Sequence, residues 1–181
     1  MSAPMKLTVA AAAVVAGLAA ASPANAECFL KLEGVKGEST DAKHAGEIDV
    51  LAWSWGVTQP GGSSVAGGAS ASRPNVGDIK LSKALDSAST ALAMSGVLGK
   101  PFRSAVLSCR KSGRSQAEFV TITLGEVYVS AFALSTTSQV PQEELSLSFR
   151  TIKIEYRPSR PDGSLGDSTS FSWDTVARKP G

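Results

Sequence analysis

Residues Glu47 to Gly56 read EIDVLAWSWG, and this stretch decides the fold class. It is rich in isoleucine, valine and tryptophan, which favour strands, and its apolar residues occupy both parities toward its end. A strand with this pattern is usually covered on both faces. We therefore expect a central strand or a strand at a subunit contact, with Trp53 and Trp55 packed in a core or an interface.

Strand patterns continue on both sides of this stretch. Apolar residues alternate with polar residues from Cys28 to Leu32, and similar patterns follow later in the chain. The inward parity switches near Arg150, which predicts a β-bulge or a strong bend. The later strands are expected at residues 78–82, 105–109, 118–124, 127–134, 145–156 and 171–176.

One stretch between these strands predicts a helix. Ala88, Leu92 and Ser95 share a helical face, and Gly99 followed by Pro101 marks the end of the helix. With consecutive strands and a single helix, parallel crossovers are uneconomical. The sequence therefore predicts a mainly β fold, an antiparallel β-barrel or sandwich of about eight strands with one flanking α-helix.

The beginning of the chain has the pattern of an export leader. Lys6 precedes an apolar run from Leu7 to Ala21, and residues 24–26 (ANA) form an A-x-A cleavage site. The run is shorter than the roughly 20 residues that span a bilayer, so we expect no stable membrane anchor. The sequence predicts a cleavable signal peptide at residues 1–26 and one domain at residues 27–181, located in the periplasm or secreted.

Composition argues against several classes of partner and cofactor. The chain has 18 basic and 16 acidic residues, and loss of Lys6 with the leader would leave 17 against 16. A near-neutral balance gives no electrostatic footprint for nucleic acid. Two cysteines and a single histidine do not provide the spacing of a tetrahedral zinc site. We expect no metal and no cofactor.

Cys28 and Cys109 both fall on the parity that carries the leucines of their strands, so both should point inward. If the two strands are neighbours, a disulfide would close a long loop and add about 3–4 kcal/mol of stability. If they are not, the two residues are free buried thiols. The sequence leaves both alternatives open.

The candidate catalytic residues do not form a recognisable site. His44 is the only histidine, and its polar surroundings predict a surface imidazole. Asp41, Glu47 and Asp49 are expected to be solvated or salt-bridged. We therefore predict no catalytic residue. A remote alternative is a small hydrolase that uses these acidic residues or the serines of the glycine-rich stretch 59–72.

Beyond these patterns, the sequence resembles the Hcp family, the haemolysin-coregulated tube proteins of bacterial type VI secretion. The resemblance covers essentially the whole mature chain, and its most specific word is the Trp-Ser-Trp-Gly ending at Gly56. The matching words follow one another in the family's order and spacing: Phe29–Leu32, Val35–Ser39, His44–Ala45, Glu47–Gly56, Asp86, Leu92, Met94, Gly99–Lys100, Arg110–Lys111, Ile122–Leu124, Glu126–Val127, Val129–Ser130, Tyr156 and Asp162–Gly163.

The resemblance implies a β-barrel of eight to ten strands with one flanking helix, and a structural role without catalysis. Subunits of this family form six-membered rings that stack into a hollow tube. Ser54 corresponds to a family position that lines the bore, where effectors bind. The implied partners are further copies of the chain, type VI effectors, and tip and sheath components.

The predicted leader and the resemblance imply two different routes out of the cell. The family assembles in the cytoplasm and leaves through a contractile machine, whereas a signal peptide directs general export. The leading interpretation is a tube subunit of the type VI system. The alternative is an exported ring that acts as a binding module, an adhesin or a toxin carrier.

Overall fold

The computed structural model describes residues 26–59, 73–111, 117–136, 140–160 and 162–181. The predicted leader, apart from Ala26, and nearly all of the glycine-rich stretch lie outside the described residues. The secondary-structure elements are β1 (Ala26–Leu32), β2 (Ile48–Val50), β3 (Ala52–Ser54), β4 (Val57–Thr58), β5 (Asn75–Val76), β6 (Ile79–Ala84), α1 (Ser89–Leu98), β7 (Phe102–Lys111), β8 (Glu118–Ser135), β9 (Gln142–Tyr156) and β10 (Thr169–Asp174).

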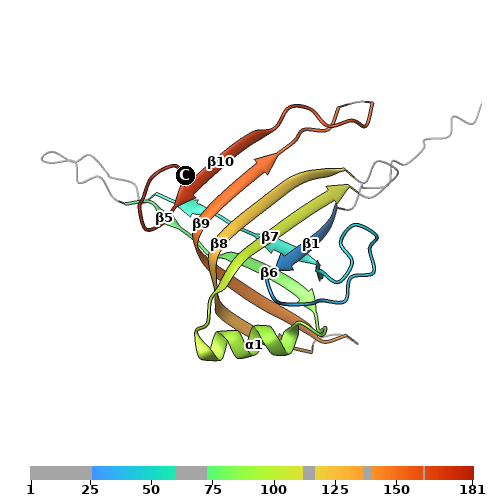
Figure 1. Ribbon diagram of the computed structural model, residues 1–181, viewed down its shortest axis with the longest axis vertical. Coiled ribbons are helices and arrows are strands. Elements are labelled where there is room, and N and C mark those ends of the chain that lie inside the picture. The colour runs from blue at the N-terminus through green and yellow to red at the C-terminus, as the bar shows by residue number, and fades with distance from the viewer. Residues whose placement is uncertain (1–25, 60–72, 112–116, 137–139, 161) are drawn as a thin grey trace, which may run out of the picture.

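Eight of the strands form one antiparallel sheet that curls into a barrel (Figure 1). The strand order is β2-β1-β7-β8-β9-β6-β3, and β10 pairs with β9 beside this path. Strands β4 and β5 form a separate two-stranded hairpin. The predicted fold class, a mainly β antiparallel barrel with one flanking helix, is confirmed.

The stretch EIDVLAWSWG closes the barrel. It divides at Leu51 into β2, which pairs with β1, and β3, which pairs with β6. The backbone N–H of Leu51 donates to the Ser82 carbonyl at 2.8 Å, so the same segment joins both edges of the sheet. The single chain does not cover both faces of this segment, because Leu51 is 59% exposed and Trp53 36% exposed, so the alternative of a strand at a subunit contact stays a prediction.

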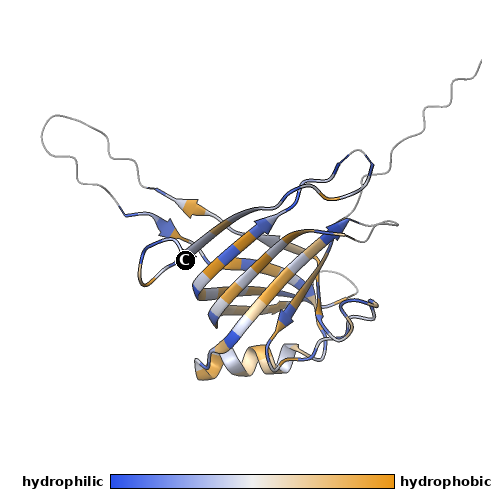
Figure 2. Cartoon of the chain, turned by 45° about the horizontal axis from the view of Figure 1, so that its top comes forward, coloured by the Kyte–Doolittle hydropathy of each residue, from blue (hydrophilic) through white to orange (hydrophobic). Residues whose placement is uncertain are grey.

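Buried apolar side chains from alternate positions of the strands fill the barrel. Figure 2 shows hydrophobic and hydrophilic residues alternating along the strands. Helix α1 packs on β8 and buries Leu92 completely. Gly99 ends the helix with a φ of 61°, and its N–H donates to the Ser95 carbonyl. Glycine adopts this left-handed conformation without steric cost, so the predicted end of the helix is confirmed.

The predicted parity switch near Arg150 is also confirmed. In β9 the buried residues change from Phe149 to Ile152, and in β8 they change from Leu124 to Val127. The register between the two strands is the same on both sides of this level, so both strands bend together. Glu126 has a φ of 49° at the bend.

The interior also contains an ion pair. Lys83 on β6 and Glu143 on β9 face one another across the strand pair, and their side chains are 1% and 0% exposed. The Lys83 Nζ lies 2.7 Å from Glu143 Oε2 and 2.8 Å from Asp86 Oδ1, and it donates to Ser89 Oγ at 3.1 Å. The ammonium therefore ties β6 and β9 to the start of α1.

Candidate functional site

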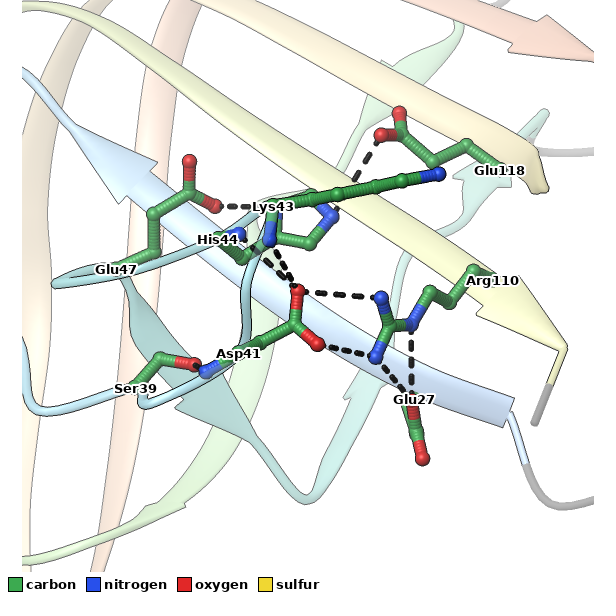
Figure 3. Close-up of polar contacts among 8 residues, drawn as sticks. All are labelled: Glu27, Ser39, Asp41, Lys43, His44, Glu47, Arg110 and Glu118. Atoms are coloured by element: carbon green, nitrogen blue, oxygen red, sulfur yellow. Dashed lines mark hydrogen bonds and ion pairs between the residues drawn. The ribbon is translucent and has the colours of Figure 1, made fainter. Parts of the chain in front are cut away.

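A group of ionisable residues connects the loop of residues 33–47 to the outer side of β1 and β7 (Figure 3). We call it the outer polar cluster. Its members come from β1, the loop, β7 and β8, which are far apart in the sequence: Glu27, Asp41, His44, Glu47, Arg110 and Glu118.

Arg110 is the centre of the outer polar cluster and is only 5% exposed. Its Nε and Nη2 donate to Glu27 Oε2 at 2.9 and 2.7 Å. Its Nη1 donates to Asp41 Oδ1 at 3.1 Å, and its Nη2 also contacts Asp41 Oδ2. The guanidinium carbon lies 5.1 Å from the centre of the Phe29 ring, within reach of a cation–π interaction.

His44 is buried, not on the surface, so the prediction of a surface imidazole is wrong. Its ring stacks on Phe29 at 4.2 Å and is 5% exposed. The reason is local: Asp41 Oδ1 accepts the backbone N–H groups of Lys43 and His44, and this turn places the imidazole against β1. His44 Nδ1 lies 2.8 Å from Glu47 Oε2.

The loop that carries Asp41 and His44 is held tightly against the barrel. The Gly37 N–H donates to the Gly46 carbonyl, and the Ser39 N–H donates to the Glu47 carbonyl. A side chain at Gly37 would collide with the Glu47 backbone. The loop is therefore a packed part of the domain, and the outer polar cluster fastens it.

Desolvation alone would raise the pKa of Asp41, but the backbone amides of Lys43 and His44 and the Arg110 guanidinium outweigh this effect and lower the pKa. A carboxyl group with a lowered folded-state pKa stabilises the fold above its unfolded pKa of about 3.9, and this contribution is lost as the pH falls through the lower folded value.

We expect the melting temperature of Asp41→Asn to fall less steeply than that of the native protein as the pH is lowered below about 4. If the melting temperatures of the two proteins fall by the same amount at each pH between pH 7 and pH 2, this role of Asp41 is contradicted.

Replacement of Arg110 by methionine should lower the free energy of unfolding by more than an exposed ion pair contributes, because it leaves the Asp41 carboxylate without its cation. The matched control is Arg103→Met, whose side chain is 86% exposed and whose ion-pair partner Glu33 is 44% exposed. That variant should change stability by about 0–1 kcal/mol. Urea unfolding measures both, and equal losses would show that Arg110 has no special structural role.

The cluster does not have the arrangement of a hydrolase site. Among the described residues, no hydroxyl or thiol is hydrogen-bonded to the His44 ring, whose Nε2 lies 3.6 Å from Glu118 Oε1 and has no hydrogen-bond partner there. The serines of the glycine-rich stretch lie outside the described residues.

Within the described ranges no group of three or more His, Cys, Asp or Glu is placed to hold a metal ion. In the same part of the chain no helix has the length and apolar character needed to span a bilayer.

The structure joins Cys28 to Cys109 by a disulfide. The two residues face one another directly across β1 and β7. The Trp53 indole N–H donates to Cys109 Sγ at 3.2 Å, so the segment that closes the barrel lies over the disulfide.

Ser54 lies at the end of β3, where it is exposed and pairs with Lys80 of β6. Trp55 packs partly against the core, with its ring 6.0 Å from that of Phe171.

Fold and site together define a nearly closed antiparallel β-barrel with one flanking helix, in which ion pairs hold a loop and the start of the helix in place. Comparison with known proteins identifies the family. The family "Type VI secretion system effector, Hcp" matches residues 29–156. The chain belongs to the Hcp family.

Individual relatives agree with this assignment. Protein hcp1 of Pseudomonas aeruginosa is 38% identical over 152 residues, which cover 82% of this chain and 94% of the relative. A solved type six secretion system protein superposes with a TM-score of 0.80 at 27% identity, covering 86% of this chain and 99% of that one. Hcp1 from Salmonella typhimurium gives a TM-score of 0.70 at 29% identity, covering 86% and 98%. The family resemblance seen in the sequence is confirmed.

Proposed function

We propose that this chain is a structural subunit of the type VI secretion tube, forming rings that stack around a hollow bore. The observation that carries the proposal is the match of one barrel to nearly the whole length of Hcp proteins, with 94% of the Pseudomonas relative and 99% of a solved type six secretion protein covered. A ring of six copies follows the family pattern. The chain acts by assembly and not by catalysis.

We infer that α1 carries a surface for assembly. Met94, Val97 and Leu98 are 59%, 84% and 53% exposed, and their spacing places them on one side of the helix. Val97 also lines a hollow of about 240 Å³ between the helix and β8, together with Phe132. A contiguous apolar surface of this kind marks an interaction site. If it meets a different surface on the next copy, the head-to-tail contact closes into a ring.

Val97→Asp should weaken ring assembly without unfolding the barrel. Burial of a valine side chain contributes about 1.5 kcal/mol, so the concentration needed for assembly should rise by about tenfold. The control is Ser168→Asp, which adds the same charge at an exposed serine outside the helix. Sedimentation at a series of concentrations measures the shift, and identical assembly of both variants would remove α1 from the interface.

We further propose that Ser54 faces the bore and contacts cargo. Its exposure at the end of β3 supports this placement. Ser54→Gln keeps the site polar but enlarges the side chain, so it should reduce the amount of effector that co-purifies with the rings while leaving ring assembly intact. Unchanged effector recovery would place Ser54 outside the cargo surface.

As the alternative to the tube subunit, we propose that residues 1–26 are an export leader and that the domain of residues 27–181 reaches an oxidising compartment as an exported ring, acting as a binding module, an adhesin or a toxin carrier. The A-x-A word before Glu27 and the cross-strand disulfide support this proposal. Cell fractionation with N-terminal sequencing tests it. A mature protein that begins at Glu27 in the periplasm supports export, and an intact N-terminus in the cytoplasm contradicts it.

Electron microscopy of the purified full chain tests the tube subunit directly. We expect ring-shaped particles with a central hole and, at higher concentration, stacks of such rings. Micrographs that show only single subunits and no rings at any concentration would contradict the proposal.

A further inference from the structure

His44 is a buried imidazole with a carboxylate opposite each of its two ring nitrogens (Figure 3). Its Nδ1 lies 2.8 Å from Glu47 Oε2, and its Nε2 lies 3.6 Å from Glu118 Oε1. Glu47 belongs to the loop that carries His44, whereas Glu118 is the first residue of β8. The imidazole therefore lies between the end of the 33–47 loop and a strand of the barrel.

Neutral His44 cannot donate a hydrogen bond to both carboxylates. A neutral imidazole has one N–H group and one acceptor nitrogen, and an ionised carboxylate only accepts. If the proton is on Nδ1, it is donated to Glu47 and the Nε2 lone pair faces Glu118. If the proton is on Nε2, the Nδ1 lone pair faces the Glu47 oxygen at only 2.8 Å. Only the imidazolium presents an N–H group to each of the two carboxylates.

The other groups around the ring carry charges of both signs. Arg110 on β7 opposes a positive charge on His44, because both side chains lie close to the Phe29 ring. Burial also disfavours the imidazolium. Carboxylates outnumber cations in these surroundings, which favours it: Glu27, Asp41, Glu47, Asp49 and Glu118 against Lys43 and Arg110. The charge of His44 therefore depends on a balance that a change of pH can shift.

We propose that His44 is a proton-dependent latch that fastens the end of the 33–47 loop to β8. When the ring is protonated, its Nε2–H group pairs with Glu118 and holds the loop against the strand. When Nε2 loses its proton to water, a lone pair faces the carboxylate and the loop opens more often. The Nδ1–H group donates to Glu47 within the loop in both states, and Arg110 continues to bind Asp41. The inference goes beyond the proposed tube subunit and depends neither on ring formation nor on export.

The protonation of His44 can be observed directly, because the chain contains no other histidine. Nitrogen-15 NMR of the untagged full chain, with labelled histidine, distinguishes the two ring nitrogens. The measurements run from about pH 5 to pH 8.5, because histidine ordinarily changes its charge in this range. At the alkaline end the remaining proton should be on Nδ1, where Glu47 accepts it. A neutral ring with its proton on Nε2 would overturn the proposal, since Nε2 would still donate toward Glu118.

Hydrogen exchange followed by mass spectrometry measures how often the loop opens. The protection factor of residues 39–47, taken relative to the unfolded chain at the same pH, should fall about two- to fivefold between pH 5.5 and pH 8.5. In Glu118→Gln this fall should be absent, because no carboxylate faces Nε2. The same variant should release the Nε2 proton at a lower pH than the native chain, since it lacks the charge that stabilises the imidazolium.

Glu155→Gln is the matched control. Glu155 lies on the neighbouring strand β9 and is 35% exposed, close to the 38% of Glu118, but its ion pair is with Lys153. This variant should keep the native pH dependence of both the exchange and the imidazole signals. Protection of residues 39–47 that does not change with pH in the native chain would overturn the proposal. Equal responses of Glu118→Gln and Glu155→Gln would overturn it as well.

Discussion

Replacement of Lys83 by methionine is expected to lower the free energy of unfolding by about 3–5 kcal/mol, the largest effect expected for a single charge removal among the residues that the structure describes. The reason is that Glu143 is 0% exposed and its Oε2 lies 2.7 Å from the Lys83 ammonium. Without the ammonium, a buried carboxylate has no compensating charge, and Asp86 and Ser89 lose their link to β6. Urea unfolding followed by circular dichroism measures the change.

The double variant Lys83→Met with Glu143→Leu separates the cost of a stranded charge from the value of the pair. It should recover part of the lost stability, because replacing both members of a buried pair by apolar residues of similar size is often close to neutral, whereas Asp86 still lacks its cation. Lys153→Met is the matched control, since its ion pair with Glu155 is half exposed and should contribute about 0–1 kcal/mol. If Lys83→Met cost no more than this control, the buried pair would have no structural role.

Removal of the disulfide is the second large effect. The Cys28→Ala, Cys109→Ala double variant should lose roughly 4 kcal/mol, because the bond closes a loop between residues 81 positions apart. For a domain of this size the melting temperature should fall by roughly 8–16 °C. Thermal denaturation of the native chain with and without reductant should give a similar difference.

Thiol titration under denaturing conditions provides the control for this prediction. The oxidised chain should react with no alkylating reagent until it is reduced, and then with two equivalents, one at Cys28 and one at Cys109. Two reactive thiols in protein taken from an oxidising compartment, with no effect of reductant on melting, would contradict a disulfide in the cellular protein.

Local patterns were sufficient for most of the fold. Alternation of apolar residues located the strands, Gly99 located the end of the helix, and the change of parity at Arg150 located the shared bend of β8 and β9. Each of these features depends on residues close together in the sequence. The family words then indicated the same barrel.

The closure of the barrel needed information that the sequence pattern does not carry. The run from Ile48 to Ser54 looks like one strand, and only the positions of β1 and β6 divide it at Leu51 between two sheet edges. In the single chain this leaves Leu51 and Trp53 exposed, although their composition is that of a covered strand. Contact with another copy would cover them.

The burial of some ionisable residues could have been predicted from the sequence. Lys83 shares the parity of Ile79 and Leu81, and Glu143 shares that of Leu145, so a search for charges in apolar positions would have found the pair. The burial of His44 had no such signal. It depends on a turn made by Asp41 and on the Phe29 ring supplied by another element.

The central claim is that the chain is a ring-forming tube subunit, and its mass in solution tests this claim most directly. Light scattering on the purified chain across a hundredfold range of concentration should show a discrete closed oligomer, near six times the mass of the subunit, and larger multiples as rings stack. A species with the mass of one subunit at every concentration would contradict the account.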